Sequence, residues 1–411
     1  MTRVVVTGLG VVSPLGNDLP TTWQGLMEGR SGIGNITLFD TSAYEYAIGG
    51  EVRGFEPNPV MEAKDLRHID RYCQFAINAS LEAVRDAGLE IGDGLGERAG
   101  VVYGSGAGGY TLLEEQAKVL TQKGPRRVTP FFLTNILPDA ASGYIAIHTG
   151  SMGPNMAVIS ACATGAGSIG EAAEIIKRGD ADVMIAGGAE APITANLYAG
   201  FNALRAIATP KDDPARACRP FDRNRDGFVV GEGAATVVLE SWEHAQARGA
   251  RVYAEVVGYG SSNDAFDMVA SDEYGRGAAL AMNMALRKSG LPLEQVGYVN
   301  AHGTATPMND RVETLALKKV FGEHAYKLAV SSTKSMTGHM MGAAGAAEAI
   351  FSIMALHNQV LPPTMHYEEP DPDCDLDYVP NEARPVQDLE ATLSTSIGLG
   401  GHNAALIFAK A

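Results

Sequence analysis

The sequence has few cysteines, no excess of positive charge and no long hydrophobic run. The four cysteines are far apart and form no CxxC pair, which argues against a zinc site or a disulfide framework and predicts a reducing, cytoplasmic setting. The net charge is −16, which argues against nucleic acid as a general partner. No apolar run is long enough to span a membrane. The first residues, MTRVVVTGLGVVSPLG, are interrupted by glycines and a proline, so they predict a strand and a turn rather than a signal peptide.

The chain is instead rich in glycine, and its order of predicted elements repeats. At 411 residues it is too long for one simple core, so two domains or two fused halves are expected. Strands and helices alternate up to about residue 250, and the same order then recurs. For example, the helix exit ALRKSGL at residues 285–291 echoes AVRDAGL at residues 83–89. The repetition predicts an α/β fold of two related halves, residues 1–250 and 251–411, with buried mixed sheets.

Residues 156–178, MAVISACATGAGSIGEAAEIIKR, place a cysteine where a strand meets a helix. Residues 156–160 predict a short buried strand, and residues 165–178 predict an amphipathic helix with Lys177 and Arg178 in its last turn. Free amide N–H groups and the positive end of the helix dipole favour a thiolate at Cys162. Two interpretations stay open at this point: Cys162 is a nucleophile, or it is one of the many free cysteines that are simply buried.

Two histidines of the second half lie at turns of the same kind. His302 follows a predicted strand in NAHGTATP, and His339 in KSMTGH precedes a helix rich in glycine and alanine. Each alone is compatible with a surface or core histidine. Together with Cys162 they offer a nucleophile and two imidazole donors for a carbonyl oxygen. Lys334 is either a solvated lysine or a charge that orients these groups. Glu348 lies on the helix that we expect to be buried, so it needs a partner, and Lys334 is the candidate.

Two glycine-rich turns and several basic residues complete the candidate sites. The turn GSGAGG at residues 104–109 matches GxGxxG, but no acidic residue follows about twenty positions later, so we interpret it as a tight turn. The turn SIGLGGHN at residues 396–403 either offers free amides to an oxyanion or is a plain strand-entry loop. A local docking surface for an acidic partner is suggested by Lys64, Arg67, His68, Lys123, Arg126, Arg127, Arg205 and Lys211.

Four segments together resemble the β-ketoacyl-[acyl carrier protein] synthases, and most closely the synthase II type, the elongating condensing enzymes of bacterial fatty-acid synthesis. They are ACATG at 161–165, NAHGTATP at 300–307, SSTKSMTGH at 331–339 and GGHN at 400–403, and the resemblance covers essentially the whole chain. It implies a thiolase-like α/β fold of two pseudo-symmetric halves, in α-β-α-β-α layers with five-stranded mixed sheets, and a homodimer. Acyl carrier protein is the implied partner, with neither nucleic acid nor membrane.

The resemblance also implies roles for individual residues. Cys162 would take an acyl chain as a thioester, and His302 and His339 would bind a malonyl thioester and promote its decarboxylation, in line with nucleophilic catalysis and oxyanion stabilisation. The backbone amides of Cys162 and Leu399 would form one oxyanion hole and the two imidazoles a second. The implied supporting and substrate-binding positions are Lys334, Glu348, Phe228, Ala107, Thr304, Thr306, Ile397 and Leu399. Carrier protein would dock at Lys64, Arg67, Arg126, Arg127 and Arg205.

No cofactor or catalytic metal is implied, and a structural monovalent cation beside Asn300, Glu348 and Ser396 stays open. The chain departs from the family pattern at positions that shape the acyl site. Ile397 and Leu399 stand where phenylalanine is common, and Ala107 stands where a bulkier aliphatic residue is common. These departures predict acceptance of long or branched acyl chains.

Three other interpretations differ in chemistry or in pathway. A non-catalytic chain-length factor would share the fold but lack the cysteine, so the presence of Cys162 argues against it. A thiolase would carry a second catalytic cysteine near the C-terminus, which the GGHN turn does not offer. A type II polyketide ketosynthase, paired with a chain-length factor, would use the same chemistry and stays open as the alternative to fatty-acid elongation.

Overall fold

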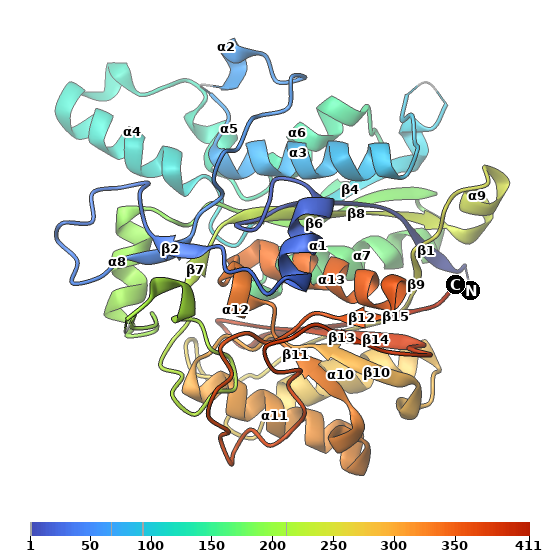
Figure 1. Cartoon of the computed structure of the whole chain (residues 1–411). Coiled ribbons are helices and arrows are strands. Elements are labelled where there is room, and N and C mark those ends of the chain that lie inside the picture. Colours follow the sequence, from blue (N-terminus) through green and yellow to red (C-terminus); the bar gives the residue numbers. More distant parts are fainter. Residues whose placement is uncertain (1, 67, 93, 211) are drawn as a thin grey trace.

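The computed structural model describes residues 2–66, 68–92, 94–210 and 212–411, and a large mixed sheet forms its centre (Figure 1). The strands of this sheet are β1 (Val4–Val12), β4 (Ala99–Gly104), β5 (Asn155–Met156), β6 (Val183–Glu190), β8 (Gly233–Ser241), β9 (Ala254–Asn263), β10 (Val296–Asn300), β11 (Ala329–Ser331), β14 (Ala391–Gly398) and β15 (His402–Ala409). Short strands outside it are β2 (Ile33–Asn35), β3 (Ile48–Gly50), β7 (Val230–Gly231), β12 (Val360–Leu361) and β13 (Arg384–Pro385).

The large sheet consists of two copies of one five-stranded arrangement. The first half runs β5-β4-β6-β8-β1 and the second runs β11-β10-β14-β15-β9. In each half the first three strands are parallel and the next two are added antiparallel. Strands β1 and β9 join the halves, with Val5 opposite Glu255. The prediction of two pseudo-symmetric halves with five-stranded mixed sheets is therefore confirmed. The boundary at residue 250, which falls just before β9, stays a prediction.

Helices form three layers: one on the outer face of each half of the sheet and one between the two halves (Figure 1). The outer face of the first half carries α3 (Arg71–Asp86) and α6 (Ala140–Thr149), the middle layer is α7 (Thr164–Arg178) and α13 (Ala344–Asn358), and the outer face of the second half carries α10 (Arg276–Ser289) and α11 (Pro307–Phe321). This is the implied α-β-α-β-α order. No helix in the described ranges has the length and apolar character needed to cross a membrane.

The other helices connect these layers. They are α1 (Leu19–Met27), α2 (Ala63–Leu66), α4 (Tyr110–Lys123), α5 (Phe132–Ile136), α8 (Ala195–Ala203), α9 (Trp242–Ala247) and α12 (Lys334–Thr337). The short 3-10 turns are η1 (Gly96–Arg98), η2 (Pro125–Arg127), η3 (Ala161–Ala163), η4 (Pro214–Arg216), η5 (Leu293–Gln295), η6 (Gly322–Lys327) and η7 (Met341–Ala343).

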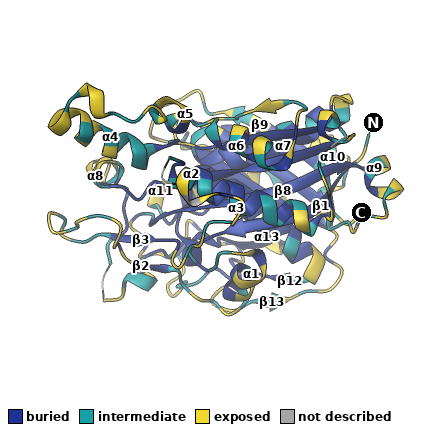
Figure 2. Cartoon of the chain, turned by 90° about the horizontal axis from the view of Figure 1, so that it is seen from above, coloured by how far each residue is buried: buried dark blue, intermediate teal, exposed yellow. Residues whose placement is uncertain are grey.

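The middle layer depends on small residues. Every residue of β1, β6, β8 and β14 is buried, because helices cover both faces of the sheet (Figure 2). Gly165 of α7 lies against Ala346 of α13, and Gly345 of α13 lies against Ala166 of α7. A Cβ atom on Gly165 would meet the Ala346 amide nitrogen at 2.6 Å. Glycine at these positions therefore allows two helix N-termini to lie side by side at the centre of the molecule.

The strand predicted at residues 156–160 is wrong in its extent and its burial. Strand β5 covers only Asn155–Met156, and Met156 and Ile159 are 44% and 55% exposed. In the sheet order β5 is the outermost strand and pairs with β4. Strand β5 therefore lies at the edge of the sheet, and its two residues stay exposed although α6 packs beside them.

Candidate active site

Cys162 lies on a strained turn between β5 and α7, which we call the nucleophile turn (residues 160–163). Ala161 has a φ of 49°, in the left-handed region that non-glycine residues rarely adopt. Ala163 N donates to Ser160 O at 3.0 Å, and Ser160 N donates to Thr164 Oγ1 at 2.9 Å. The Cys162 side chain is buried at the N-terminal end of α7. Its position at a strand-to-helix turn agrees with the sequence prediction.

The two halves bring Cys162, His302 and His339 together. His302 follows β10 and His339 precedes η7, and both side chains are buried. His339 Nε2 lies 3.0 Å from Cys162 Sγ, and the two imidazole ring centres are 5.2 Å apart, with the planes at 86°. One nitrogen of each histidine and the sulfur all lie within 4.8 Å of one another. A carbonyl group bound here would reach the thiol and both imidazoles.

Burial keeps these three groups neutral at rest. It raises the pKa of the Cys162 thiol to about 11, against the opposing effects of the Lys334 charge and a hydrogen bond from the Leu399 amide. It also lowers the pKa of His302 and of His339 well below 6.5, and the Lys334 charge lowers both further. The resting sulfur is therefore a thiol and not the thiolate expected from the end of the helix, because removal of the sulfur from water outweighs the nearby positive charge.

Lys334 and Glu348 form a buried ion pair beside His302. Both side chains are almost fully buried, and Lys334 Nζ donates to Glu348 Oε1. Burial raises the pKa of Glu348 to about 7 in spite of the lysine. Lys334 Nζ also lies 3.3 Å from His302 Nδ1. An ammonium group only donates, so Nδ1 accepts and the His302 proton is assigned to Nε2. The expected pairing of Lys334 with Glu348 is present.

The cluster has the residue types of a metal site, but its surroundings fit poorly. A metal-bound histidine usually donates its second N–H to a carboxylate or a carbonyl group. His302 Nδ1 instead faces the Lys334 ammonium group. A metal ion at His302 Nε2 would displace the proton from that nitrogen. That proton would either move to Nδ1, which breaks the hydrogen bond from Lys334, or leave the imidazole altogether. The arrangement therefore suits a thiol with imidazole N–H donors better than a set of three metal ligands.

A cavity of about 410 Å³ opens onto Cys162. Phe228 packs edge-on against His339, with ring centres 5.7 Å apart, and Leu399 is 44% exposed at the mouth. Ala107 is not part of this lining among the described residues; its amide instead donates to Glu190 at 3.0 Å. The predicted residues that line the cavity are Cys162, Phe228, His302, Thr304, Thr306, His339, Ile397 and Leu399.

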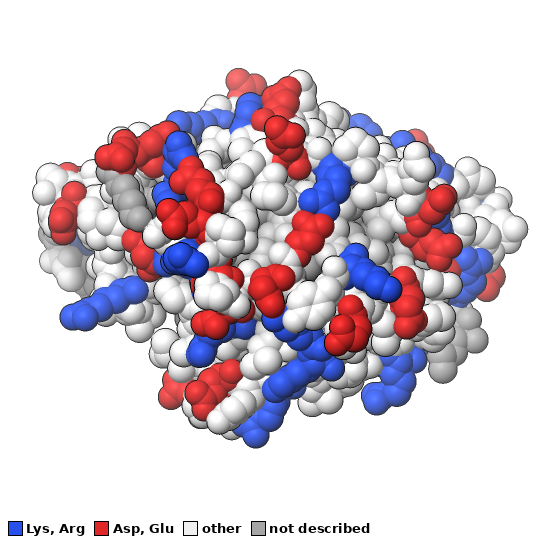
Figure 3. Space-filling view, turned by 60° about the horizontal axis from the view of Figure 1, so that its bottom comes forward, with Lys and Arg blue, Asp and Glu red and all other residues white. Residues whose placement is uncertain are grey.

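The predicted docking residues lie on the surface, though not in one element. Arg205 lines the cavity mouth, and Arg67 and Lys211 lie outside the described residues. His68 stacks on Phe131 with ring centres 4.3 Å apart, so the segment after α2 lies beside the segment after η2. Basic and acidic side chains are interspersed on the face that carries α10 and α11 (Figure 3). Most of the described docking candidates are exposed, namely Lys64, Lys123, Arg126, Arg127 and Arg205, whereas His68 is half-buried.

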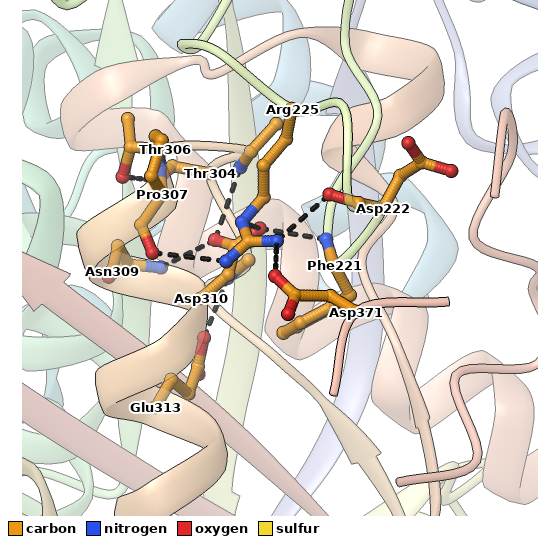
Figure 4. Close-up of polar contacts among 12 residues, drawn as sticks. Phe221, Asp222, Arg225, Thr304, Thr306, Pro307, Asn309, Asp310, Glu313 and Asp371 are labelled. Carbon is orange, nitrogen blue, oxygen red and sulfur yellow. Dashed lines mark hydrogen bonds and ion pairs between the residues drawn. The ribbon is translucent and has the colours of Figure 1, made fainter. Parts of the chain in front are cut away.

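Two carboxylates of α11 hold the loop that carries His302 (Figure 4). Glu313 accepts from the amides of His302 and Gly303, both at 2.8 Å, and Asp310 accepts from the amide of Ala305 at 3.2 Å. A buried arginine completes the network through the pairs Arg225–Asp371, Arg225–Asp310 and Arg225–Pro307. Sequence analysis missed these residues. The only available signal was the spacing of two acidic residues on a helix that begins directly after NAHGTAT.

Several buried polar atoms beside Glu348 have no hydrogen-bond partner in the described structure: Asn300 Oδ1 and Nδ2, Ser394 Oγ, Ser396 Oγ and Glu348 Oε2. Asn300 is opposite Ser394 on the neighbouring strands β10 and β14. A Cβ atom on Gly345, one turn before Glu348, would lie 2.7 Å from Ser396 Oγ. Carboxylate, amide and hydroxyl oxygens are the ligands that hard cations prefer. These residues therefore fit the cation that the resemblance left open.

A buried thiol beside two neutral imidazoles, where two like halves meet, matches the site that the resemblance implies for an acyl-transferring enzyme of the thiolase-like fold. Two family models, described as the N-terminal and C-terminal domains of beta-ketoacyl synthase, match residues 1–245 and 253–368. The chain belongs to the β-ketoacyl synthase family.

Similar proteins cover the whole chain. The 3-oxoacyl-[acyl-carrier-protein] synthase 2 of Staphylococcus aureus (strain N315) is 52% identical over 99% of this chain and 98% of its own length. The protein of the same name from Synechocystis sp. is 49% identical over 99% and 98%. A beta-ketoacyl synthase from Burkholderia phymatum STM815 superposes over 100% of both chains with a TM-score of 0.92 and 36% identity. A type II polyketide ketosynthase, solved in complex with its acyl-carrier protein, superposes over 100% of both chains with a TM-score of 0.90 and 33% identity.

Proposed function

We propose that this enzyme is a β-ketoacyl-[acyl carrier protein] synthase that elongates fatty acyl chains by two carbons. The observation that carries the proposal is the position of the Cys162 thiol, 3.0 Å from His339 Nε2 and within 4.8 Å of a ring nitrogen of His302. Lys334 fixes His302 as a donor. The greater identity to synthases of fatty-acid elongation, 49% to 52%, than to the polyketide ketosynthase, 33%, favours this pathway over the alternative.

In the first step the Cys162 sulfur attacks the thioester carbon of an acyl group on carrier protein. The thiol proton passes to His339 Nε2, 3.0 Å away, and then to the departing pantetheine sulfur. The backbone N–H groups of Cys162 and Leu399 stabilise the negative charge that develops on the carbonyl oxygen. The products are an acyl thioester on Cys162 and free carrier protein, so the reaction is divided into two easier steps.

In the second step a malonyl thioester on carrier protein enters the cavity. His302 and His339 donate N–H groups to its thioester carbonyl oxygen, and loss of CO₂ leaves an enolate that these donors stabilise. The enolate carbon attacks the acyl carbon, and the Cys162 sulfur leaves with its electron pair. The sulfur takes a proton from His339 Nε2, 3.0 Å away, and solvent replaces that proton. His339 can accept in one step and donate in the other, because its Nδ1 has no partner among the described residues.

Mass spectrometry tests the reaction. The purified enzyme is incubated with acyl carrier protein thioesters, and we expect an adduct on Cys162 and no adduct on Cys162→Ser. Addition of malonyl carrier protein should release a β-ketoacyl product longer by two carbons. An unmodified Cys162 after incubation with a range of acyl chains would contradict the proposal.

We propose acyl carrier protein as the partner and the exposed basic residues as its docking surface. Thr304 and Thr306, whose hydroxyl oxygens are 3.0 Å apart on the cavity wall, would bond to the pantetheine arm. The double variant Arg126→Glu with Arg127→Glu should raise the KM for carrier protein about tenfold and leave kcat nearly unchanged, because rim charges act on association. Arg178→Glu, an exposed change on α7, serves as the control. An unchanged KM in the double variant would show that docking occurs elsewhere.

We propose that the enzyme is a homodimer that pairs through β5. The outer edge of β5 is exposed together with apolar side chains of the flanking chain and of the adjacent α6, namely Ile147, Met152, Met156 and Ile159. An exposed apolar strand edge favours pairing with another chain. Ile147→Glu with Met152→Glu should convert the dimer into a monomer in light scattering. A wild-type monomer at micromolar concentration would refute the pairing.

We propose a reducing cytoplasmic setting and a structural monovalent cation. All four cysteines are free and buried, as expected in a reducing compartment, and cell fractionation with thiol labelling tests the location.

Asn300, Ser396 and Glu348 would hold the cation with oxygen atoms. Thermal unfolding in potassium, sodium and tetramethylammonium salts at equal ionic strength tests the site. Equal melting temperatures in all three salts would exclude it.

A further inference from the structure

Glu190 is a fully buried carboxylate that the proposed steps do not use. It is the last residue of β6 and is 0% exposed. Burial raises its pKa, and the hydrogen bonds that it accepts oppose this rise. The donors are Ser105 Oγ at 2.6 Å, Gly106 N at 2.7 Å, Ala107 N at 3.0 Å and Gly342 N at 2.9 Å. A buried charge is costly unless such donors satisfy it, so Glu190 and these donors depend on one another.

The four donors belong to two turns that meet beside the nucleophile turn. One is the turn directly after β4, and the other is residues 340–343 of the second half, which we call the counterpart turn. A Cβ atom on Gly106 would lie 3.6 Å from Ala161 O and 3.7 Å from Gly342 N. The turn after β4 therefore lies between the other two turns, and Glu190 holds it there. Gly106 is itself exposed, so open space reaches this point.

The counterpart turn also shapes the cavity. Met341 has a φ of 45°, a strained conformation that specific contacts must maintain. Its side chain lines the cavity with Cys162 and packs in the same cluster as Ile193 and Tyr198. The hydrogen bond from the next amide, Gly342 N, to Glu190 supports this conformation from the first half of the chain.

We propose that Glu190 is a positioning residue that sets the wall against which the acyl chain on Cys162 lies, and thereby determines which acyl thioesters the enzyme accepts. The inference rests on the proposed function and deepens it. His339 does not depend on Glu190, because its own backbone is anchored to the β7 region: His339 N donates to Val229 O at 2.7 Å, and Gly231 N donates to His339 O at 2.9 Å. Loss of Glu190 should therefore affect acylation and leave decarboxylation nearly intact.

The test is the variant Glu190→Gln, which keeps the size of the side chain but replaces one acceptor oxygen by an NH₂ group. Two of the four donors then lose their acceptor. We expect kcat/KM for acylation of Cys162 to fall about tenfold or more for the preferred chain, the value of one hydrogen bond to a charged group. The ratio of long-chain to short-chain acylation should change about fivefold or more, while release of CO₂ from malonyl carrier protein stays within about threefold.

Glu232→Gln is the matched control. Glu232 is also fully buried, accepts from Val52 N at 2.9 Å and pairs with Arg71, so its replacement should lower stability without a change in the chain-length ratio. If Glu190→Gln does not fold, Ser105→Ala decides. It removes one of the four donors to Glu190, together with the acceptor of the Gly108 amide, and should shift the ratio about twofold in the same direction. An unchanged ratio in the folded variant, or an equal loss in acylation and decarboxylation, would overturn the inference. Failure of the wild-type enzyme to acylate Cys162 would instead refute the proposed function.

Discussion

The nucleophile turn and the counterpart turn have a similar backbone but different chemistry. Ala161 and Met341 both have positive φ, 49° and 45°, and each is the first residue of a 3-10 turn that leads into a helix of the middle layer. At one turn the next residue is Cys162, beside His339. At the other it is Gly342, whose N–H group is bonded to Glu190 at 2.9 Å. The comparison teaches that both turns have a backbone that could present a nucleophile. Chemistry occurs at the first turn because it carries the Cys162 thiol, whereas the second carries a glycine whose amide is already bonded to Glu190.

The two halves also divide the groups that act at the site. The first half contributes the sulfur, and the second contributes both imidazoles and the Lys334–Glu348 pair. Helix α7 carries charged residues on its outer side, whereas α13 is almost entirely buried. A buried helix can hold a charge such as Glu348 only with a partner. The second half therefore supplies the electrostatics of the site and the first half supplies the covalent step.

The largest expected effect comes from removal of the thiol at the nucleophile turn. Cys162→Ala should lower the rate of condensation at least about 10⁴-fold, because no other group can form the thioester. A second change, Gly342→Cys, should not restore it, since a Cβ atom there would lie 2.6 Å from Glu190 Oε2. Product formation with acyl and malonyl carrier protein is the measurement. Recovery of activity in the double variant would show that the two turns are interchangeable.

The pH dependence of Cys162 alkylation comes next. A thiol with a pKa of about 11 is protonated at neutral pH, and its thiolate fraction rises about tenfold for each pH unit below that value. Alkylation by iodoacetamide should therefore increase about a thousandfold between pH 7 and pH 10, without a plateau. Peptide mass spectrometry separates Cys162 from the other buried cysteines. A plateau below pH 8 would show that the end of α7 and Lys334 outweigh burial.

The packing of the two middle helices predicts a smaller effect, on stability. Gly165→Ala places a Cβ atom 2.6 Å from the Ala346 amide, which should lower the free energy of unfolding by about 1–3 kcal/mol. Gly200→Ala in α8 is the matched control, because its Cβ atom would meet nothing within 4 Å, and it should raise stability by about 0.5–1 kcal/mol. Urea denaturation measures both. Equal stability of the two variants would mean that α7 and α13 do not pack closely.

The smallest expected effect concerns the mouth of the cavity. Leu399 is 44% exposed there, and Leu399→Phe should reduce acylation by long or branched chains about threefold relative to short ones, because the larger ring narrows the entrance. Acylation of Cys162 across a series of chain lengths is the measurement. Leu204→Phe is the control, because it adds the same ring to an equally exposed leucine at the same mouth. A sharp cutoff at short chains in the wild-type enzyme would contradict the expected breadth.

Sequence analysis predicted the duplicated architecture because the hydrophobic period and the glycine turns are local signals. It selected Cys162, His302, His339 and Lys334 from strand-to-helix turns and from motifs, and the structure brings these four residues together. It did not identify Glu190, Glu313 or Arg225, because each acts through hydrogen bonds to residues distant in the chain or to backbone groups that no motif marks. It also overestimated the strand at residues 156–160, since an apolar run at an exposed edge has the same pattern as a buried one.

By itself the sequence determined the two-half α/β fold, the family and the residue types of the site, since these depend on periodicity and on the order of motifs. Only the tertiary structure decided the protonation state of Cys162 and which side chains lie next to its sulfur. His339 Nε2 reaches the sulfur across 177 residues of chain, and the pKa of the thiol depends on how completely the fold removes it from water. The distance between His339 and Cys162 and the desolvation of the thiol both arise from the packing of the two halves against each other. No local sequence pattern in either half encodes that packing.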